Sequence, residues 1–548
     1  MGSLRPVSLL NCMGKWLEDL MITRLGVDIE AGDWLDDRQF GFRAGRGAED
    51  AVNRLIDGAR SVSGRYVVGL FLDISGAFDG ARWSDMLERV NAISGCRHLV
   101  RLFEDYFADR HAQMTLNWGS FRKALDRGCP QGSKVGPLGW ILLFDSFLRL
   151  PWPSRVQATA YADDAALIIG ADTRKELEET AGVCCTLIEK WGAEHAQVFN
   201  AKKTEAIMLR LPRGTDPDKY RTLTVRLGGQ SVKFKKAVRY LGVMLERGFT
   251  FSTHSRVVTQ RAKAAYAGVA RIVRADWGVS FRVGRLIYDA VVVSIVAYAA
   301  STFDHRVREN LRFAHSLRAA QRPALLALCK AYRTTSTAAL CVLAGTLPLD
   351  YVVLERAAMY RLRHGTPVQW RGRDIQPGDG CAWKERTRQT LRECAIEEWD
   401  EEWRESGDGR LTYSFLPSVD SRMKMDWFVP SKFTTWMVTG HGPFRTYYER
   451  FRLRPAMACR CGEPRQTAEH ILWVCSEADD LRRAALEGLR ELNGGVVPVG
   501  GWSNPDWFSC REAHRLLAEL RERLSCAARR TRSNEWGTDQ RDPRWAGL

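Results

Sequence analysis

Short apolar runs alternate with longer amphipathic stretches between about residues 64 and 247. The runs YVVGLFL (66–72), VQATAY (156–161) and AALIIG (165–170) consist mainly of β-branched, aromatic and small residues, which is typical of buried strands. The stretch from about Glu176 to Trp191 predicts a long helix, and VRYLGVMLE (238–246) predicts a further strand. This alternation predicts an α+β core.

The segments on either side of this core predict helices. Before it, helical patterns such as NCMGKWLEDLMITRL alternate with the Gly- and Arg-rich QFGFRAGRGAED. From about 251 to 363 the pattern is helical and Ala-rich, with basic residues on the polar faces. Residues 365–380 are rich in Gly, Pro and Arg, which predicts a linker before a block dense in Trp and Arg. The expected parts are a first domain 1–250, a helical domain 251–364, a linker 365–380, a C-terminal domain 381–526 and a polar tail 527–548.

Two adjacent carboxylates, Asp163 and Asp164, stand between the apolar runs of TAYADDAALIIG. The runs are separated by two residues, which is the spacing of a β-hairpin, so we expect both acids at the hairpin tip. Like charges held this close repel, and desolvation raises the pKa of at least one of them unless a cation lies between them and a third acid. The pair predicts a metal site; taken alone, the stretch also fits a solvated Asp-Asp turn.

A third acid ends the apolar run 67–72. Asp73 follows this run directly, and Phe78 lies five residues later, in the expected turn into a helix. An acid at a strand end beside a double-acid hairpin is the arrangement that two-metal phosphoryl transfer requires. A helix N-cap is the alternative for Asp73 alone, but the three acids together favour a site for phosphoryl transfer.

The charge balance adds an expected partner. The 548-residue chain has 81 Lys+Arg against 65 Asp+Glu, a formal net charge of +16 spread along its length, so we expect it to bind a polyanion. The 14 Cys form no regular framework and are expected to be mostly reduced core residues. The longest apolar run, 290–300, is too short to span a bilayer, and no signal peptide or other targeting signal is evident. A soluble, intracellular protein without a membrane partner is expected.

The segment CRCGEPRQTAEHILWVC contains four side chains that can bind a metal: Cys459, Cys461, His470 and Cys475. Three thiolates and one imidazole suit Zn²⁺, and four protein ligands close the site, which predicts a structural rather than a catalytic zinc. Arg460, Arg465 and Trp473 lie within the same segment, and basic groups with aromatics suit RNA or single-stranded DNA. A zinc staple that only stabilises the fold is the alternative.

Five motifs occur in a fixed order along the chain: FLDISGAFD, GCPQGSKVGP, YADD, NAKKTEAIML and VRYLGVMLE. In this order and spacing they closely resemble the palm of reverse transcriptases, specifically in polyproteins of non-LTR retrotransposons, over about residues 4–250. RPVSLLNCMGKWLEDLMITRL and QFGFRAGRGAED are similar to the finger motifs of that family. TGHGPFRTYYERFRLR followed by the Cys/His cluster is similar to the type-1 elements that insert into insect ribosomal DNA. The resemblance implies a right-hand polymerase with fingers, palm and helical thumb, and a C-terminal zinc-knuckle-like domain.

The resemblance also implies roles for single residues. Asp73, Asp163 and Asp164 would hold two Mg²⁺ ions. Lys203 matches the Lys that protonates the departing pyrophosphate, although the sequence does not separate it from the adjacent Lys202. Phe78 would exclude a 2′-hydroxyl and so select deoxynucleotides, with core packing as the alternative. The loop under the nucleotide is matched by four residues: Gly128, Pro130, Gln131 and Gly132. Arg5 and Arg43 match finger positions that approach the triphosphate, with a solvated basic face as the alternative.

The implied function is that of an RNA-directed DNA polymerase, a nucleotidyltransferase that adds dNTPs to a DNA 3′-hydroxyl on an RNA template. In cells this implies target-primed copying of the element's own RNA at a nicked chromosome, hence nuclear action after cytoplasmic synthesis. Because the chain starts inside the first finger motif, we expect a fragment of a polyprotein whose endonuclease lies elsewhere. A catalytically inactive nucleic-acid-binding fragment and a group II intron-type reverse transcriptase are the alternatives, and the C-terminal cluster argues against the second.

Overall fold

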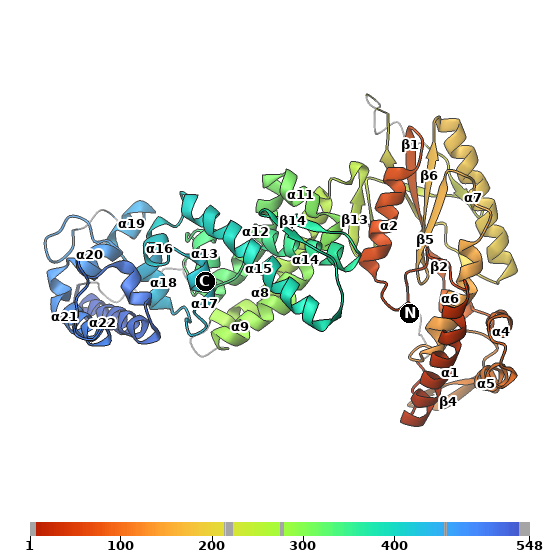
Figure 1. Ribbon diagram of the computed structural model, residues 1–548, viewed down its shortest axis with the longest axis horizontal. Helices are drawn as coiled ribbons and strands as arrows, with labels where there is room; N and C mark the ends of the chain where they lie inside the picture. The colour runs from red at the N-terminus through yellow and green to blue at the C-terminus, as the bar shows by residue number, and fades with distance from the viewer. Residues whose placement is uncertain are drawn as a thin grey trace. The chain divides into compact units, whose positions relative to one another are not determined.

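The computed structural model consists of two compact units, Met1–His254 and Ser255–Leu548 (Figure 1). It describes residues 7–212, 214, 223–274, 279–453, 455 and 458–535. The first unit mixes helices and strands, and the second is almost entirely helical. The predicted α+β class is therefore confirmed for the first unit.

A five-stranded sheet forms the centre of the first unit, in the order β11-β8-β1-β6-β5. Every neighbouring pair is antiparallel except β11 and β8. The central strand β1 is buried on both faces except at Tyr66, because its residues are almost all apolar. The strands of the sheet are β1 (Tyr66–Leu72), β5 (Val156–Tyr161), β6 (Asp164–Ala171), β8 (Glu205–Arg210) and β11 (Lys233–Lys235).

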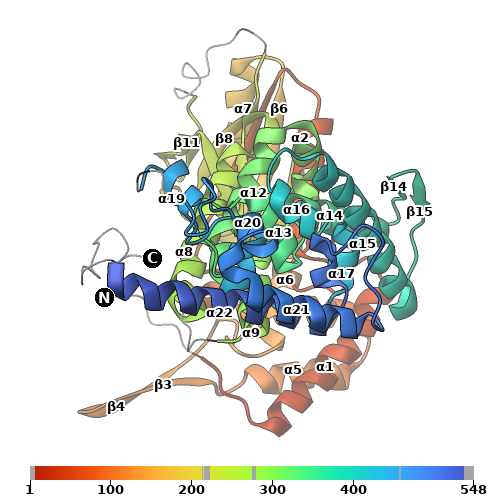
Figure 2. The same ribbon diagram turned by 90° about the vertical axis from the view of Figure 1, so that its left-hand side faces the viewer.

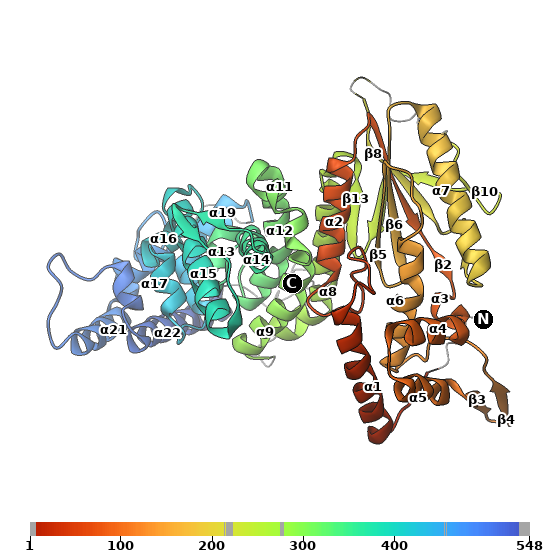
Figure 3. The same cartoon turned by 45° about the vertical axis from the view of Figure 1, so that its right-hand side comes forward.

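Helices cover both faces of this sheet (Figures 1 and 3). On one face α6 (Val135–Leu148) contacts β5, and α7 (Arg174–Glu194) contacts β6; both belong to the main core together with alternate residues of β1. On the other face α2 (Ala48–Ser61) packs against β5 and β6. The predicted strands 66–72, 156–161 and 165–170 and the predicted long helix are confirmed.

Smaller elements complete the first unit. The predicted strand 238–246 is a hairpin of two short strands, because Leu241 and Gly242 both take positive φ and turn the chain. The remaining helices are α1 (Cys12–Ala31), α3 (Ala77–Gly80), α4 (Trp83–Ile93) and α5 (Arg97–Phe107). The remaining strands are β2 (Ile74–Ser75), β3 (His111–Leu116), β4 (Gly119–Ala124), β7 (Val198–Phe199), β9 (Arg226–Leu227), β10 (Gln230–Ser231), β12 (Ala237–Tyr240) and β13 (Val243–Glu246).

The second unit packs helices around buried aromatic side chains such as Trp403, Phe415 and Trp507. The helical character predicted for residues 251–364 is confirmed. Its helices are α8 (Ser252–Arg274, which starts at the end of the first unit), α9 (Phe281–Tyr288), α10 (Ser294–Val296), α11 (Asp304–Glu309), α12 (Leu311–Leu328), α13 (Thr337–Ala344), α14 (Leu349–Arg363), α15 (Gly380–Glu405), α16 (Arg410–Phe415), α17 (Val419–Lys424), α18 (Lys432–Thr439), α19 (Arg445–Arg450), α20 (Ala468–Trp473), α21 (Asp479–Leu492) and α22 (Arg511–Glu535).

The segment predicted as a linker, residues 365–380, is instead a β-hairpin inside the second unit. Its strands β14 (Val368–Trp370) and β15 (Arg373–Ile375) are joined by Arg371 and Gly372, which both take positive φ. Trp370 is 3% exposed, and its indole N–H donates to Glu398 of α15 at 2.7 Å. The Gly and Arg that indicated a linker therefore form the turn and its ion pairs with α15. The first residues of the predicted polar tail, up to Glu535, are helical.

By length and composition alone, one helical stretch in the described part of the chain, Phe281–Thr302, could cross a membrane. The bent pair of α13 and α14 would add a second such stretch if it is counted as one span. The stretch Phe281–Thr302 is twice as long as the apolar run seen in the sequence. About 44% of its apolar window is buried inside the protein, and core helices of soluble proteins meet the same criteria.

Replacing Trp370 by Ala tests whether residues 365–380 are part of the fold. We expect the second unit to lose about 3 kcal/mol or more of unfolding free energy, because a buried Trp leaves a large cavity. Chemical denaturation followed by circular dichroism measures the loss. Gln369→Ala, at the exposed neighbouring position, is the control and should change stability by less than about 0.5 kcal/mol. A Trp370→Ala variant as stable as this control would restore the linker.

Candidate active site

The hairpin of β5 and β6 carries the two adjacent acids. Tyr161 pairs with Asp164, so Ala162 and Asp163 form the two-residue turn and Asp164 begins β6. The acids lie at the hairpin tip as predicted. The turn consists of Ala162 and Asp163, one residue earlier than the expected Asp163 and Asp164. Ala162 has a φ of +58°, a conformation that costs energy in a residue with a Cβ. The tip therefore needs support from outside the hairpin.

Strand pairing brings the third acid to the same place. Leu72 of β1 pairs with Ala165 of β6, so Asp73 follows β1 at the end of the sheet where Asp164 begins β6. The Oδ2 atom of Asp73 is buried and accepts no hydrogen bond from the described residues, and Nζ of Lys203 lies 3.9 Å from it. A buried carboxylate oxygen without a donor is costly unless a further positive group occupies the space.

Asp164 shows the electrostatic consequence of this arrangement. Desolvation raises its pKa, and the nearby charges of Asp163 and Asp73 raise it further, to about 6. Part of the Asp164 residue surface remains accessible to solvent, so an ion can reach it. Three carboxylates with one unsatisfied oxygen and one raised pKa are a donor set that fits hard divalent cations such as Mg²⁺.

A buried glutamine supports the strained turn, and the sequence analysis did not single it out. Oε1 of Gln39 accepts hydrogen bonds from the backbone N–H groups of Ala162 (3.0 Å) and Gly41 (2.9 Å), and its Nε2 donates to the carbonyl of Ala162 at 3.4 Å. The Gln39 residue is 0% exposed. A Cβ on Gly41 would lie 2.2 Å from the nitrogen of Ala162, so only Gly permits this close approach. The QFGFR segment thus fixes the turn that carries Asp163.

The GCPQGSKVGP loop lies next to the helix that follows Asp73. The N–H of Cys129 donates to the carbonyl of Phe78 at 2.6 Å, and Nε2 of Gln131 donates to Asp79 at 3.3 Å. Gly132 has a φ of +95°, and a Cβ there would lie 2.8 Å from the carbonyl oxygen of Ser8. Phe78 is half-buried and stacks on Trp140 at 5.5 Å, so it packs in the core; selection against a 2′-hydroxyl stays a prediction.

The basic residues predicted for the site differ in their surroundings. Lys203 is the lysine near Asp73, and its side chain is 69% exposed. Arg43 donates to the carbonyls of Asp36 (2.7 Å) and Gln39 (3.4 Å), so it holds the same loop that supports the turn. Its contact with a triphosphate stays a prediction. Arg5 lies outside the described residues.

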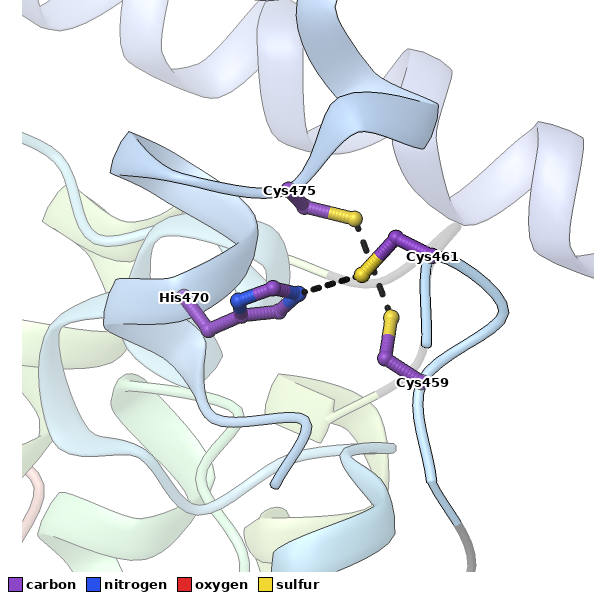
Figure 4. A group of neighbouring side chains, drawn as sticks. All are labelled: Cys459, Cys461, His470 and Cys475. Atoms are coloured by element: carbon purple, nitrogen blue, oxygen red, sulfur yellow. Dashed lines mark hydrogen bonds between the residues drawn. The ribbon is translucent and has the colours of Figure 1, made fainter. Parts of the chain in front are cut away.

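The Cys/His cluster is assembled in the second unit (Figure 4). The ligand atoms of Cys459, Cys461, His470 and Cys475 all lie within 4.8 Å of one another. Sγ of Cys459 is 3.7 Å from Sγ of Cys475, and Sγ of Cys461 is 3.3 Å from Nε2 of His470. Two sulfurs on one tetrahedral zinc are about 3.7 Å apart, so the separation fits this ion.

The surroundings of Cys459 favour its thiolate, whereas burial and the neighbouring Cys459 raise the pKa of the Cys475 thiol. Burial opposes ionisation of Cys459, but hydrogen bonds from the backbone of Cys461 and from Nε2 of Gln466 outweigh it and lower the pKa of the thiol. Trp473 packs near Trp507, with ring centroids 5.9 Å apart, and its indole N–H donates to Asn504. This Trp therefore contributes to packing within the unit.

Comparison with known proteins shows which family the chain is similar to. Residues 1–245 match the family model for reverse transcriptase (RNA-dependent DNA polymerase). The chain is 35% identical to a putative 115 kDa protein in type-1 retrotransposable element R1DM of Drosophila melanogaster, over 95% of this chain and 50% of that protein. It is 31% identical to a retrovirus-related Pol polyprotein from type-1 retrotransposable element R1 of Bradysia coprophila, over 92% of this chain and 49% of that protein.

A third relative is covered completely. The retrovirus-related Pol polyprotein from type-1 retrotransposable element R1 of Nasonia vitripennis is 30% identical, over 62% of this chain and 100% of that protein. By contrast, the chain spans about half the length of the Drosophila and Bradysia proteins. The chain belongs to the family of Pol polyproteins of type-1 retrotransposable element R1, which contain a reverse transcriptase domain.

Proposed function

We propose that this chain is an RNA-directed DNA polymerase that copies retrotransposon RNA, with residues 1–250 as fingers and palm and 251–364 as a helical thumb. The observation that carries the proposal is the meeting of Asp73, Asp163 and Asp164 at one end of the sheet, with an unsatisfied oxygen on Asp73 and a raised pKa at Asp164. Such carboxylates are suited to hold the cations of phosphoryl transfer. Its partners are an RNA template, a DNA primer and dNTPs.

Each residue of the site has a task in this reaction. Asp73, Asp163 and Asp164 would hold two Mg²⁺ ions, which when bound activate the primer hydroxyl and neutralise the departing pyrophosphate. The ammonium of Lys203, which lies 3.9 Å from Asp73, would give a proton to the leaving group. Gly132 would let the loop backbone approach the nucleotide, and Phe78 would lie beneath its sugar.

The second unit would serve to hold nucleic acid. The four-ligand cluster fits a structural Zn²⁺ that joins the loop of Cys459 to helix α20. Beside it lies a cavity of about 780 Å³ whose lining includes Tyr447, Arg450 and Arg465. Aromatic and guanidinium groups together suit RNA or single-stranded DNA. In cells the chain would act in the nucleus, where it would extend the 3′-hydroxyl of a nicked target DNA along the element's own RNA.

Primer extension with Asp163→Asn tests the proposed activity. The variant keeps the side-chain volume and removes a charge, so we expect dNTP incorporation on an RNA template to fall by more than about a hundredfold while template binding stays within about threefold. Asp172→Asn, the same change just after the other end of β6, weakens an exposed ion pair with Arg155 and leaves an oxygen that can still accept from the backbone of Arg65, so it should be nearly neutral. Activity of Asp163→Asn within tenfold of wild type would contradict the proposal.

The raised pKa of Asp164 predicts an acid limb in the activity. Below a pH of about 6 the carboxyl is protonated and loses the charge that attracts a cation, so extension should fall as pH drops through this value. The midpoint should move to lower pH as the Mg²⁺ concentration rises, because protons and cations compete for the same oxygen atoms. Initial rates between pH 5 and 8 measure this. A midpoint that does not depend on the Mg²⁺ concentration would contradict the assignment.

Gln39→Met tests the support of the turn. Met has a similar volume but leaves the N–H of Ala162 without its acceptor, so Asp163 loses its fixed position. We expect kcat to fall by roughly tenfold or more and the Mg²⁺ concentration for half-maximal rate to rise, with little change in the KM for dNTP. Gln197→Met is the control, because Gln197 is also buried but neither side-chain polar atom is hydrogen-bonded within the described structure. Equal kinetics for the two variants would remove Gln39 from the site.

His470→Ala tests whether the zinc cluster contributes to RNA binding without contributing to polymerase activity. The variant should lose its Zn²⁺, because a three-ligand site loses affinity and closure, whereas extension on a short annealed template-primer should change little. RNA binding should weaken and depend less steeply on salt. Metal analysis, extension and binding titrations are compared with His364→Ala, at an exposed position of the same unit. Full metal content in His470→Ala would contradict the ligand set, and lost metal with unchanged binding would leave only a structural staple.

A further inference from the structure

β3 and β4 form a two-stranded ribbon that belongs to no larger sheet. The ribbon follows α5 and leads directly into the loop 128–132 of the active site; the N–H of Leu125 donates to the carbonyl of Arg110 at 2.9 Å and closes its base. Figures 2 and 3 show the ribbon extending away from α5. Apart from Ala112 and Gly119, every residue of β3, β4 and the turn between them is exposed.

The register divides the ribbon into two faces. Gln113 pairs with Arg122 and Thr115 pairs with Ser120, so these side chains share a polar face, on which Gln113 donates to Ser120 at 3.0 Å. Met114 pairs with Phe121, and Leu116 pairs with Gly119, on the opposite face. The ring of Trp118, in the turn, lies 5.4 Å from that of Phe121. We call the second set the ribbon face: Met114, Leu116, Trp118 and Phe121.

The ribbon face is apolar and exposed in the part of the chain that the structure describes. Trp118 is 76% exposed, Phe121 50% and Met114 42%. A two-stranded hairpin is marginally stable in water by itself, and a cluster of exposed apolar side chains at its tip adds to the cost. Such a surface is typical of a binding site.

The charges of the ribbon indicate what kind of partner fits. Residues 110–125 contain no Asp or Glu, and they contain Arg110, Arg122 and Lys123. Arg122 and Lys123 are exposed on β4. A partner that is anionic and also offers flat apolar surfaces combines both properties, and single-stranded nucleic acid is such a partner because its bases stack on aromatic rings while its phosphates meet cations.

We propose that the ribbon face binds a single-stranded segment of the RNA template, with bases stacked on Trp118 and Phe121 and a phosphate near Lys123, which pairs with Ala112 on the same face. This rests on the proposed function, which supplies the RNA, and on the short chain connection between β4 and the loop 128–132. The ribbon thereby holds template outside the site of chemistry.

The test uses the full chain and a fluorescent single-stranded RNA, in the Asp163→Asn background and without dNTP, so that binding is measured apart from catalysis. The double variant Trp118→Leu/Phe121→Leu keeps the apolar character and removes the ring faces. We expect it to bind roughly tenfold or more weakly. The double variant Trp118→Tyr/Phe121→Tyr keeps the rings and should bind within about twofold of wild type.

A second pair of variants tests the phosphates. Lys123→Gln should lower the slope of log affinity against log salt concentration by about 0.7, because one phosphate is no longer neutralised. Arg122→Gln, on the opposite polar face, is the control and should leave the slope nearly unchanged. Wild-type binding by the Leu pair would overturn the proposal. Self-association through the ribbon would also overturn the proposal. It would appear in sedimentation as a dimer that persists in the Trp118→Leu/Phe121→Leu variant and is lost in Trp118→Asp, while the RNA affinity of Trp118→Asp stays unchanged. A wild-type protein without polymerase activity would instead contradict the proposed function, and the measured RNA binding of the ribbon would remain valid.

Discussion

The backbone pairing of β1 with β6 is the interaction on which the site depends. It sets Leu72 opposite Ala165, so that Asp73 and Asp164, far apart in the sequence, lie at the same end of one sheet. The pairing is robust because both strands are buried by helices on the two faces of the sheet and consist mainly of apolar residues. A shift of the register by one residue would turn each side chain of β6 to the other face and separate the carboxylates.

The same pairing creates a cost that other parts of the first unit offset. Burial and, after it, the charges of Asp163 and Asp73 raise the pKa of Asp164, and a buried oxygen of Asp73 is left without a hydrogen-bond donor within the described structure. The turn at Ala162 adds backbone strain, and Gln39 stabilises it with hydrogen bonds from a different segment. Strain and repulsion are kept at the place where a bound cation would relieve them. The electrostatics of the three carboxylates therefore favour a bound cation over an empty site.

The sequence predicted the parts of this account that depend on local patterns. Buried strands and the long helix follow from apolar runs and periodicity, and the three acids stand out because each interrupts or ends such a run. Gln39 could not be found in this way, since its contact with Ala162 joins residues 123 positions apart and Gln is a common surface residue. The prediction of a linker at residues 365–380 was wrong for a different reason. Gly and Arg are common both in linkers and in tight turns, and the burial of Trp370 shows that this segment is a hairpin. The ribbon of β3 and β4 was not predicted, because its sequence lacks the continuous apolar run that is typical of a buried strand.

The most direct test of the central claim is a Mn²⁺ titration followed by electron paramagnetic resonance, with Mn²⁺ as a paramagnetic substitute for Mg²⁺. If one cation site is shared by the strand ends, Asp73→Asn and Asp163→Asn should each weaken Mn²⁺ binding by roughly tenfold or more, and the double variant should lose little beyond the larger single effect. Independent, fully additive losses in the double variant, or wild-type affinity in either single variant, would contradict a shared site.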